Sequence, residues 1–387
     1  MLKKAIILLQ DYLKSLGYTA QIHFELEGCY KTRVSKQAIN FTAINRVLLE
    51  LGIDGEVVNE YWKNQWEYVS LFNGQSPLKE AENLEKAMSN LPTIFAKHGM
   101  YDTLIQPVVW SGDQGRLAVG SDDIFTTDTR AVHIPNAIQI NVSVLNKQGV
   151  NIIPDGGFGE FLQQCFLQTS KTCSLLYLPE EDAFERFKLT SYYGLAQELC
   201  SPCDISGGHQ GSVALYKEVG KHNQLMGEEH LFFDQHNNAL LTQHNWQKTA
   251  RIEHRLGASS LAYNPYANVL FALANIIDAI EVYQDNRCQS ALLPSTAAIA
   301  LPESLYNKTA HSENNTDNNL GAIALFTECH WLSNCINNVQ MLMEKSTRLL
   351  SYQTRLGDLV KQQILAQYQH KKIQLPFNFN QAKYNKI

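Results

Sequence analysis

Residues 250–281 read ARIEHRLGASSLAYNPYANVLFALANIIDAIE, and this stretch predicts a strand that leads into a helix. Arg251, Glu253 and Arg255 stand at alternate positions, so a strand would direct all three charges to one face. Ile252 and Leu256 would lie on the opposite face, which the intervening histidine weakens. Three converging charges suit a site for a metal and an anion, although for this segment in isolation an exposed strand with paired charges would be the better interpretation.

The helix in this stretch begins at a clear boundary. Asn264 offers an N-cap side chain and Pro265 is suited to the first helical position. Apolar residues follow at helical spacing, at Leu270, Leu273, Ala274, Ile277 and Ile280. The helix also carries polar side chains, at Asn268, Asn275 and Asp278, so we expect a core helix and not a membrane span.

The composition is that of a soluble protein of enzyme size. The chain has 387 residues, 44% of them hydrophobic and 18% charged, with a net charge of −6. This length allows one large domain or two ordinary ones. The absence of a long basic run argues against a nucleic-acid or anionic-membrane surface. Residues 1–9 (MLKKAIILL) superficially resemble a signal peptide, but the apolar run stops at Gln10 and no cleavage site follows, so we expect an amphipathic helix and a cytoplasmic protein.

Short strand-like runs are mixed with helical stretches along the chain, which favours an α+β architecture. Examples of such runs are residues 138–145 and 174–178. We expect a single catalytic domain over residues 1–387. Within it, residues 305–320 are polar and predict a surface loop, and residues 321–370 predict a C-terminal helical part.

Eight cysteines over this length are too sparse for a disulfide framework. Cys200 and Cys203 form the one C-x-x-C motif. It allows a redox pair, or half of a zinc site together with His209, but a single motif of this kind occurs more often as free thiols.

Several motifs resemble the glutamine synthetase family and follow its order. The RIEHRL and NPY segments are similar to its Arg-x-Glu-x-Arg and Asn-Pro-Tyr segment. Earlier in the chain, residues 24–27 (FELE), 60–67 (ending NQWE) and 81–99 (ending AKHG) resemble its first strand, its Gly-Gln-Trp-Glu strand and the next helix. Residues 301–306 and 356–360 resemble its late loop and closing helix. The resemblance implies a curved antiparallel sheet forming an open funnel, backed by α-helices.

Five glutamates carry the predicted chemistry. Glu25 and Glu27 are two residues apart, so a strand would direct both to one face. Glu60 and Glu67 are seven apart, so on one regular strand they would need a bulge or bend to meet. Such a cluster needs divalent cations, and oxygen ligands favour Mg²⁺ or Mn²⁺. The resemblance implies one cation at Glu27, Glu60 and Glu67, and a second at Glu25 and Glu253 bridging the phosphates of ATP.

Arginine is the expected phosphate ligand, because the chain lacks a glycine-rich phosphate motif. The resemblance implies that Arg251 faces the nucleotide phosphate, that Arg255 faces the transferred phosphoryl group or the substrate carboxylate, and that Ser143 also contacts the nucleotide.

Four differences from the family pattern stand out. The expected first strand comes too early to leave room for the family's N-terminal β-grasp domain, which puts ammonia as co-substrate and ring assembly in doubt. Gln139 and Asn141 replace the family's His-x-His, as weaker neutral metal ligands. The pattern of residues 139–141 is also similar to glutamate–cysteine ligases. The family's Asn-Arg-Ser…Arg segment falls on residues 210–217, where one arginine is lost and Lys217 could substitute for the other. The family also has a loop glutamate that closes over the amine site, and Glu198 is its nearest match here.

Two hypotheses follow. The first is an ATP-dependent ligase that phosphorylates a glutamate γ-carboxylate and transfers the acyl group to a small-molecule amine or thiol larger than ammonia, in a monomer or homo-oligomer. The second is a degenerate relative that binds a partner or a small molecule without catalysis. The retention of all five glutamates favours the ligase.

Overall fold

The computed structural model describes residues 1–32, 39–60, 64–71, 74–99, 101–110, 133–184, 186, 212–216, 250–284, 301–307, 320–344 and 355–369. Its centre is an open antiparallel sheet of seven strands in the order β2-β3-β1-β7-β9-β8, with β4 paired to β1. The strands are β1 (Thr19–Thr32), β2 (Gly55–Asn59), β3 (Gln65–Ser70), β4 (Tyr101–Leu104), β7 (Ala137–Leu145), β8 (Val213–Tyr216) and β9 (Arg251–Ala258). Two further short strands, β5 (Val108–Trp110) and β6 (His133–Pro135), pair with each other.

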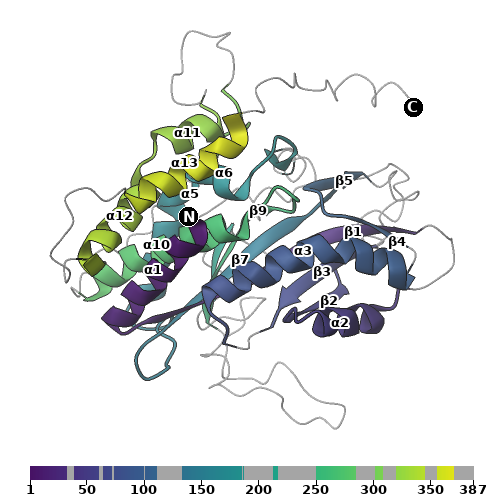
Figure 1. The fold of residues 1–387 in the computed structure, drawn as a ribbon, viewed down its shortest axis with the longest axis horizontal. Coiled ribbons are helices and arrows are strands. Elements are labelled where there is room, and N and C mark those ends of the chain that lie inside the picture. Colours follow the sequence, from purple (N-terminus) through teal and green to yellow (C-terminus); the bar gives the residue numbers. More distant parts are fainter. Residues whose placement is uncertain are drawn as a thin grey trace.

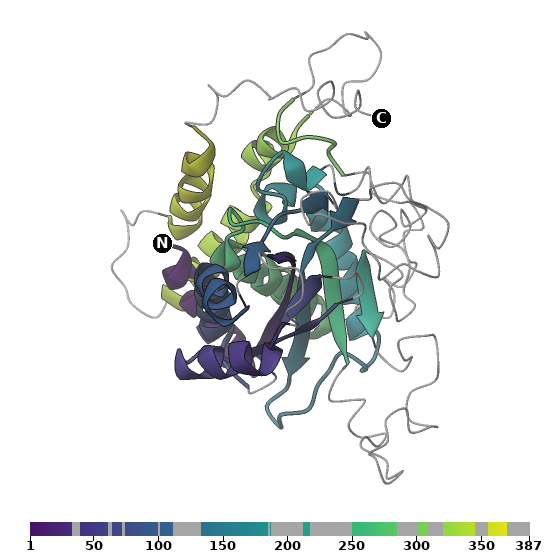
Figure 2. The same ribbon diagram turned by 90° about the vertical axis from the view of Figure 1, so that its right-hand side faces the viewer.

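Helices cover one side of this sheet (Figures 1 and 2). They are α1 (Leu2–Leu16), α2 (Phe41–Glu50), α3 (Pro77–Gly99), α5 (Phe158–Ser170), α6 (Ser174–Tyr177), α10 (Pro265–Gln284), α11 (Ala322–Glu328), α12 (Trp331–Glu344) and α13 (Leu356–Gln369). The α+β class, the antiparallel sheet and the helical backing agree with the sequence prediction.

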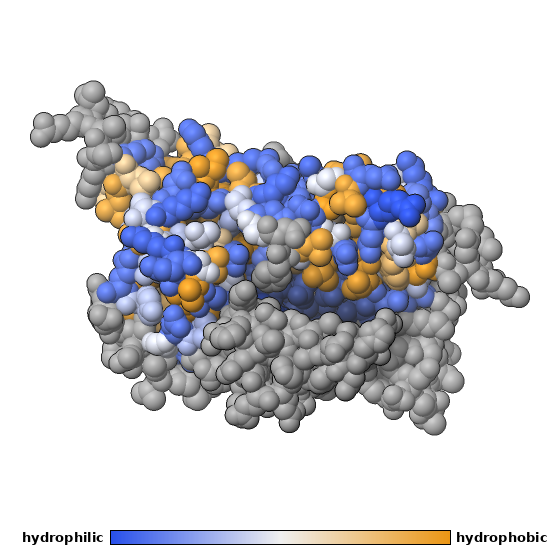
Figure 3. Space-filling view, turned by 90° about the horizontal axis from the view of Figure 1, so that it is seen from below, coloured by the Kyte–Doolittle hydropathy of each residue, from blue (hydrophilic) through white to orange (hydrophobic). Residues whose placement is uncertain are grey.

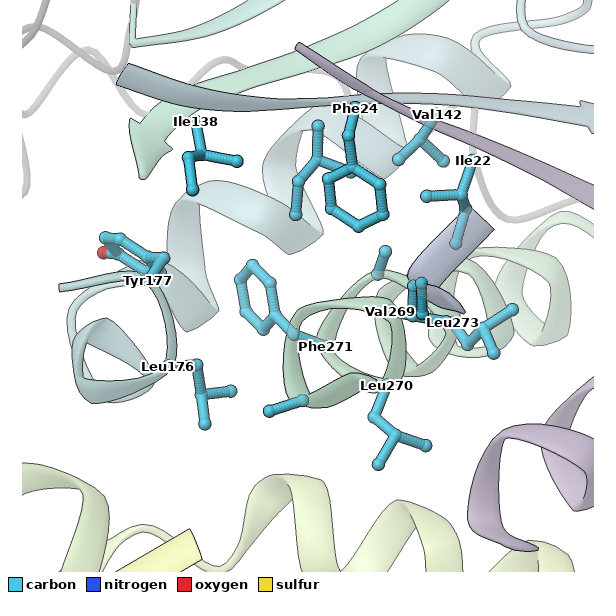
Figure 4. Packing of buried hydrophobic residues seen from close by; sticks show 14 of the residues in the cluster. Ile22, Phe24, Ile138, Val142, Leu176, Tyr177, Val269, Leu270, Phe271 and Leu273 are labelled. Carbon is cyan, nitrogen blue, oxygen red and sulfur yellow. The ribbon is translucent and has the colours of Figure 1, made fainter. Parts of the chain in front are cut away.

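The core lies between the sheet and α10. Ile22 and Phe24 of β1 and Val142 of β7 point toward Val269 and Phe271 of α10 (Figure 4). Because side chains alternate along each strand, the residues between these apolar ones point to the other face. The packing of the helices therefore fixes which side chains of β1, β7 and β9 form the polar face.

Helix α10 begins where the sequence predicts. The side chain of Asn264 accepts a hydrogen bond from the backbone N–H of Ala267 at 3.2 Å, as an N-cap does. By length and composition α10 could cross a membrane, but 78% of its most apolar window is buried inside the protein. That degree of burial is expected of the core helix of a soluble protein.

Two local predictions were wrong. Residues 174–178 are not a strand, because Ser174–Tyr177 form the short helix α6, whose buried Tyr177 packs on the core side of β9. A short apolar run does not distinguish the two structures. Glu60 and Glu67 do not share a bulged strand either, since Glu60 follows β2 and Glu67 lies on β3. The two strands form an antiparallel pair in which Asn59 is opposite Trp66.

A candidate acidic and arginine-containing site

The polar face of the sheet collects the predicted site residues in adjacent registers. Glu25 of β1 lies opposite Gln139 of β7, and Glu27 of β1 lies opposite Glu67 of β3. Asn141 of β7 lies opposite Glu253 of β9. Directly opposite residues of antiparallel strands point to the same face. Residues from four strands, far apart in sequence, thus meet on one surface.

Glu60 joins this group through the β2–β3 pairing. Its backbone N–H donates to the carbonyl oxygen of Gln65 at 3.2 Å, one step beyond the pair of Asn59 and Trp66. Glu60 is thus opposite Gln65 and points to the same face as Gln65. Glu67 lies two residues after Gln65 on β3, so it also points to this face. The antiparallel pairing of β2 and β3 therefore brings Glu60 and Glu67 to one face, for which a bulge or bend in a single strand was expected.

The glutamates are close enough to repel one another. Burial, followed by the charges of Glu25, Glu60, Glu27 and Glu253, raises the pKa of Glu67 far above the usual carboxyl range. Burial also raises the pKa of Glu27 to about 7, against the lowering effect of Arg186. Burial and the charge of Glu253 raise the pKa of Glu25 as well. At neutral pH this cluster holds protons unless a cation replaces them.

Two amides satisfy part of this acidic face. Gln139 donates from Nε2 to Glu27 Oε1 at 3.2 Å, and Asn141 donates from Nδ2 to Glu25 Oε1 at 2.9 Å. The two amide oxygens differ. Asn141 Oδ1 accepts a hydrogen bond from Arg251 Nε at 2.7 Å, whereas Gln139 Oε1 is buried and has no hydrogen-bond partner among the described residues.

Glu253 differs from the other glutamates because two arginines compensate its negative charge. Its two oxygens accept from Arg251 Nη2 at 3.1 Å and from Arg255 Nε at 2.6 Å. The Glu253 side chain is 4% exposed, so both contacts lie in a medium of low dielectric constant. The alternation of charges predicted for residues 251–255 is thus a buried carboxylate between two guanidinium groups.

Three side chains of the face were not predicted as site residues. Tyr216 of β8 contacts both arginines. His23 of β1 lies opposite Asn141, and burial together with the charge of Arg251 lowers its pKa to about 4. Buried Arg186 donates to the carbonyl oxygens of Arg255 and Gly257 at the end of β9. No local sequence pattern identifies Arg186 as a site residue. His23 could have been identified, because it stands at alternate positions with Glu25 and Glu27 on one strand.

The remaining predicted residues divide between inside and outside the described structure. Ser143 lies on the same face of β7, where its hydroxyl donates to Gln21 Oε1 at 3.1 Å. Lys217, Glu198, Cys200, Cys203 and His209 lie outside the described residues, as does most of the predicted surface loop, from 308 to 319. Seen from below, the described surface carries both hydrophilic and hydrophobic residues, and hydrophilic ones lie along its recessed lower edge (Figure 3).

The carboxylate and amide oxygens of this face suit a hard cation, although their side chains do not converge on one point in this structure. Within the described ranges, no three His, Cys, Asp or Glu side chains stand close enough to hold a metal ion. The chemistry nevertheless fits, because the glutamates repel one another and Gln139 Oε1 is an unpaired acceptor beside them. Carboxylate and amide oxygens are the ligands that Mg²⁺ and Mn²⁺ prefer.

Comparison with known proteins places the fold. No family model and no curated protein matches the chain. Among solved structures, one described as a novel glutamine synthase homolog aligns with a TM-score of 0.55 at 13% identity, over 94% of this chain and 74% of that one. GmaS without ligand aligns at 0.53 and 14%, and a GmaS–ADP complex at 0.55 and 12%, each over 90% of this chain and 75% of the other. The chain therefore has the fold of glutamine synthetase homologues, as the motifs predict.

Proposed function

We propose that this protein is an ATP-dependent ligase that phosphorylates a carboxylate and transfers the acyl group to an amine or thiol. The observation that carries the proposal is one polar sheet face on which four glutamates lie beside a fifth, Glu253, whose carboxylate is bound to two arginines. An acidic cluster explains the need for cations, and the arginines supply contacts for phosphate. The fold, shared with GmaS in complex with ADP, supports the same function.

The cations would be Mg²⁺ or Mn²⁺, held by Glu25, Glu27, Glu60, Glu67 and Glu253. Bound there, they would neutralise charge on the transferred phosphoryl group. Gln139 is the better of the two neutral ligands, because its oxygen has no hydrogen-bond partner in the described structure. Asn141 could serve only after its oxygen loses the hydrogen bond from Arg251.

The protein's own groups bind and orient the anions. Arg251 is held by Glu253 and Asn141, so its guanidinium is already fixed beside the acidic face. A fixed donor loses little conformational freedom when phosphate arrives, and such prearranged charges stabilise a transition state. Arg255, Ser143 and Lys217 complete the proposed catalytic and nucleotide-binding residues. The substrates would be small molecules, with a glutamate γ-carboxylate as the acyl donor, in a cytoplasmic protein.

The decisive experiment measures ADP and phosphate release from ATP with Mg²⁺, in the presence of glutamate and a panel of amines, amino acids and thiols. The expected result is acceptor-dependent ADP release in the wild type that is lost in Glu253→Gln. Calorimetry on the same samples measures binding of Mg²⁺-ATP. Absence of nucleotide binding in the wild type at millimolar metal would overturn the ligase.

One observation favours a non-catalytic relative as the second candidate. The described side chains satisfy Glu253 and Asn141 without any ligand. A protein that uses the face only for binding would take up Mg²⁺-ATP but release no ADP with any acceptor. Binding without turnover across the whole panel would therefore select this alternative.

A further inference from the structure

Tyr216 contacts both arginines of the site through two different parts of its side chain. It lies on β8 directly opposite Arg251 of β9. The guanidinium of Arg251 stands over the Tyr216 ring, 4.4 Å from its centroid. The Tyr216 hydroxyl accepts a hydrogen bond from Arg255 Nη2 at 2.5 Å. Tyr216 itself is almost fully buried, at 2% exposure.

These contacts close a ring of four side chains. Glu253 binds Arg251 and Arg255 through its two oxygens, and Tyr216 contacts the same two arginines from the neighbouring strand. Each guanidinium is thus held by a carboxylate and by a tyrosine. Glu253 gives each arginine one charged contact, and Asn141 gives Arg251 a second. Tyr216 adds a further contact to both arginines, and several contacts fix the plane of a guanidinium better than one.

We infer that Tyr216 is a positioning residue that holds Arg251 and Arg255 in place for an anionic phosphate ligand before that ligand binds. The inference deepens the proposed ligase function and rests on it. Within the ring, the Arg251 side chain is 22% exposed and that of Arg255 is 7% exposed. Arg251 is accordingly the arginine that phosphate meets first, and Arg255 acts from behind it through Glu253 and Tyr216.

Two substitutions of Tyr216 test its hydroxyl contact with Arg255 and its ring contact with Arg251 separately. Tyr216→Phe removes only the hydroxyl and keeps the ring beneath Arg251, so kcat should fall about tenfold while the Kd for Mg²⁺-ATP changes less than about threefold. Tyr216→Leu also removes the ring, and here the Kd for Mg²⁺-ATP should weaken by about tenfold. This split between kcat and Kd is not expected from a general loss of stability.

Tyr177→Phe is the matched control. Tyr177 is likewise a buried tyrosine with a hydroxyl hydrogen bond, here to the carbonyl oxygen of Ser170 at 2.7 Å, but it lies on the core side of β9. Its loss should lower the melting temperature without separating kcat from Kd. If both Tyr216 variants change kcat and Kd no more than this control does, the inference is overturned.

A second measurement tests the positioning without nucleotide. In proteins carrying ¹⁵N-labelled arginine, the Nε–H groups of Arg251 and Arg255 are hydrogen-bonded and should give slowly exchanging signals, assigned with Arg251→Lys and Arg255→Lys. Tyr216→Leu should broaden both signals and accelerate their exchange, and Tyr177→Phe should leave them unchanged. Unchanged signals in Tyr216→Leu would overturn the positioning role. Failure of the wild type to bind ATP would overturn the ligase instead.

Discussion

Arg251 donates a hydrogen bond from Nε to the side-chain oxygen of Asn141 at 2.7 Å, and this contact fixes the orientation of the amide. Were the amide turned over, its NH₂ would face another donor. In the orientation that Arg251 requires, Asn141 Nδ2 faces Glu25 and donates to it. Asn141 is therefore a bridge between a carboxylate of β1 and a guanidinium of β9. Gln139, two residues earlier, has no such contact at its oxygen from any residue that the structure describes.

This difference between the two amides predicts different phenotypes for Asn141→Ala and Gln139→Ala. Asn141→Ala removes a hydrogen-bond donor from the half-buried Glu25 and an acceptor from Arg251 Nε, so the free energy of unfolding of the metal-free protein should fall by ~1–3 kcal/mol. Gln139→Ala should cost less stability but weaken Mn²⁺ binding measured by calorimetry. Equal stability losses with unchanged Mn²⁺ affinity in both variants would contradict this assignment.

Glu67 and Glu253 predict opposite effects of the same substitution. Glu253 lies between two arginines in a nearly buried site, so Glu253→Gln should lower the free energy of unfolding by about 3 kcal/mol or more. Glu67 faces four other carboxylates. Burial and these charges raise the pKa of Glu67, so at pH 8 the folded protein must take up a proton there that the unfolded chain does not bind. Glu67→Gln removes this requirement and should raise the stability of the metal-free protein at pH 8. Denaturant unfolding with EDTA present measures both, and destabilisation by Glu67→Gln would refute the repulsive cluster.

The raised pKa values also predict a pH dependence of stability and cation binding. For a carboxyl whose folded-state pKa lies above its unfolded value, stability is present below the unfolded pKa, near 4.5, and is lost as pH rises through the folded pKa, which for Glu27 is about 7. The metal-free protein should therefore become less stable between pH 5 and 8. Over the same range Mg²⁺ should bind more tightly as pH rises and release protons. Calorimetry in buffers of different ionisation enthalpy counts these protons, and a value of zero would contradict the prediction.

Sequence reasoning succeeded where a long element carries its own pattern. The alternation of Arg251, Glu253 and Arg255 and the cap at Asn264 are local features, and the structure reproduces the strand and helix that they predict. It was less successful where the answer depends on a distant segment. The meeting of Glu60 with Glu67 depends on the pairing of β2 with β3, which the spacing of seven residues does not reveal.

Tyr216 and Arg186 show the same limit on single side chains. Tyr216 acquires its role from the register of β8 against β9, through partners more than thirty positions later in the chain. Arg186 contacts backbone carbonyls at the end of β9, about seventy residues away. Neither contact follows a periodicity or a motif, because tertiary packing alone brings the partners together. His23 was within reach, since it shares strand parity with Glu25.

His254 lies on the core face of β9, and we expect it to lower the stability of the folded protein at acidic pH. It is fully buried between Phe166, Tyr177 and Phe271. The Ser170 hydroxyl contacts His254 Nε2 at 3.1 Å and donates to the carbonyl of Phe166, so the imidazole Nε2–H is the donor to Ser170. Burial lowers the pKa of His254 to about 3.

For a group with a lowered folded-state pKa, stability is present above the unfolded pKa, near 6.5, and is lost as pH falls toward the folded value. The contribution of His254 to stability should therefore be lost as pH falls from 6.5 to 4, opposite in direction to the contribution of the glutamates. His254→Gln retains a donor toward Ser170 but cannot titrate, so its melting temperature should fall less over this range than that of the wild type. The comparison is made by thermal unfolding at pH 4.5 and 7, each variant serving as its own reference. Parallel losses in the two proteins would show that other groups cause the acid sensitivity, since the removal of the His254 proton site is the one change in titration between them.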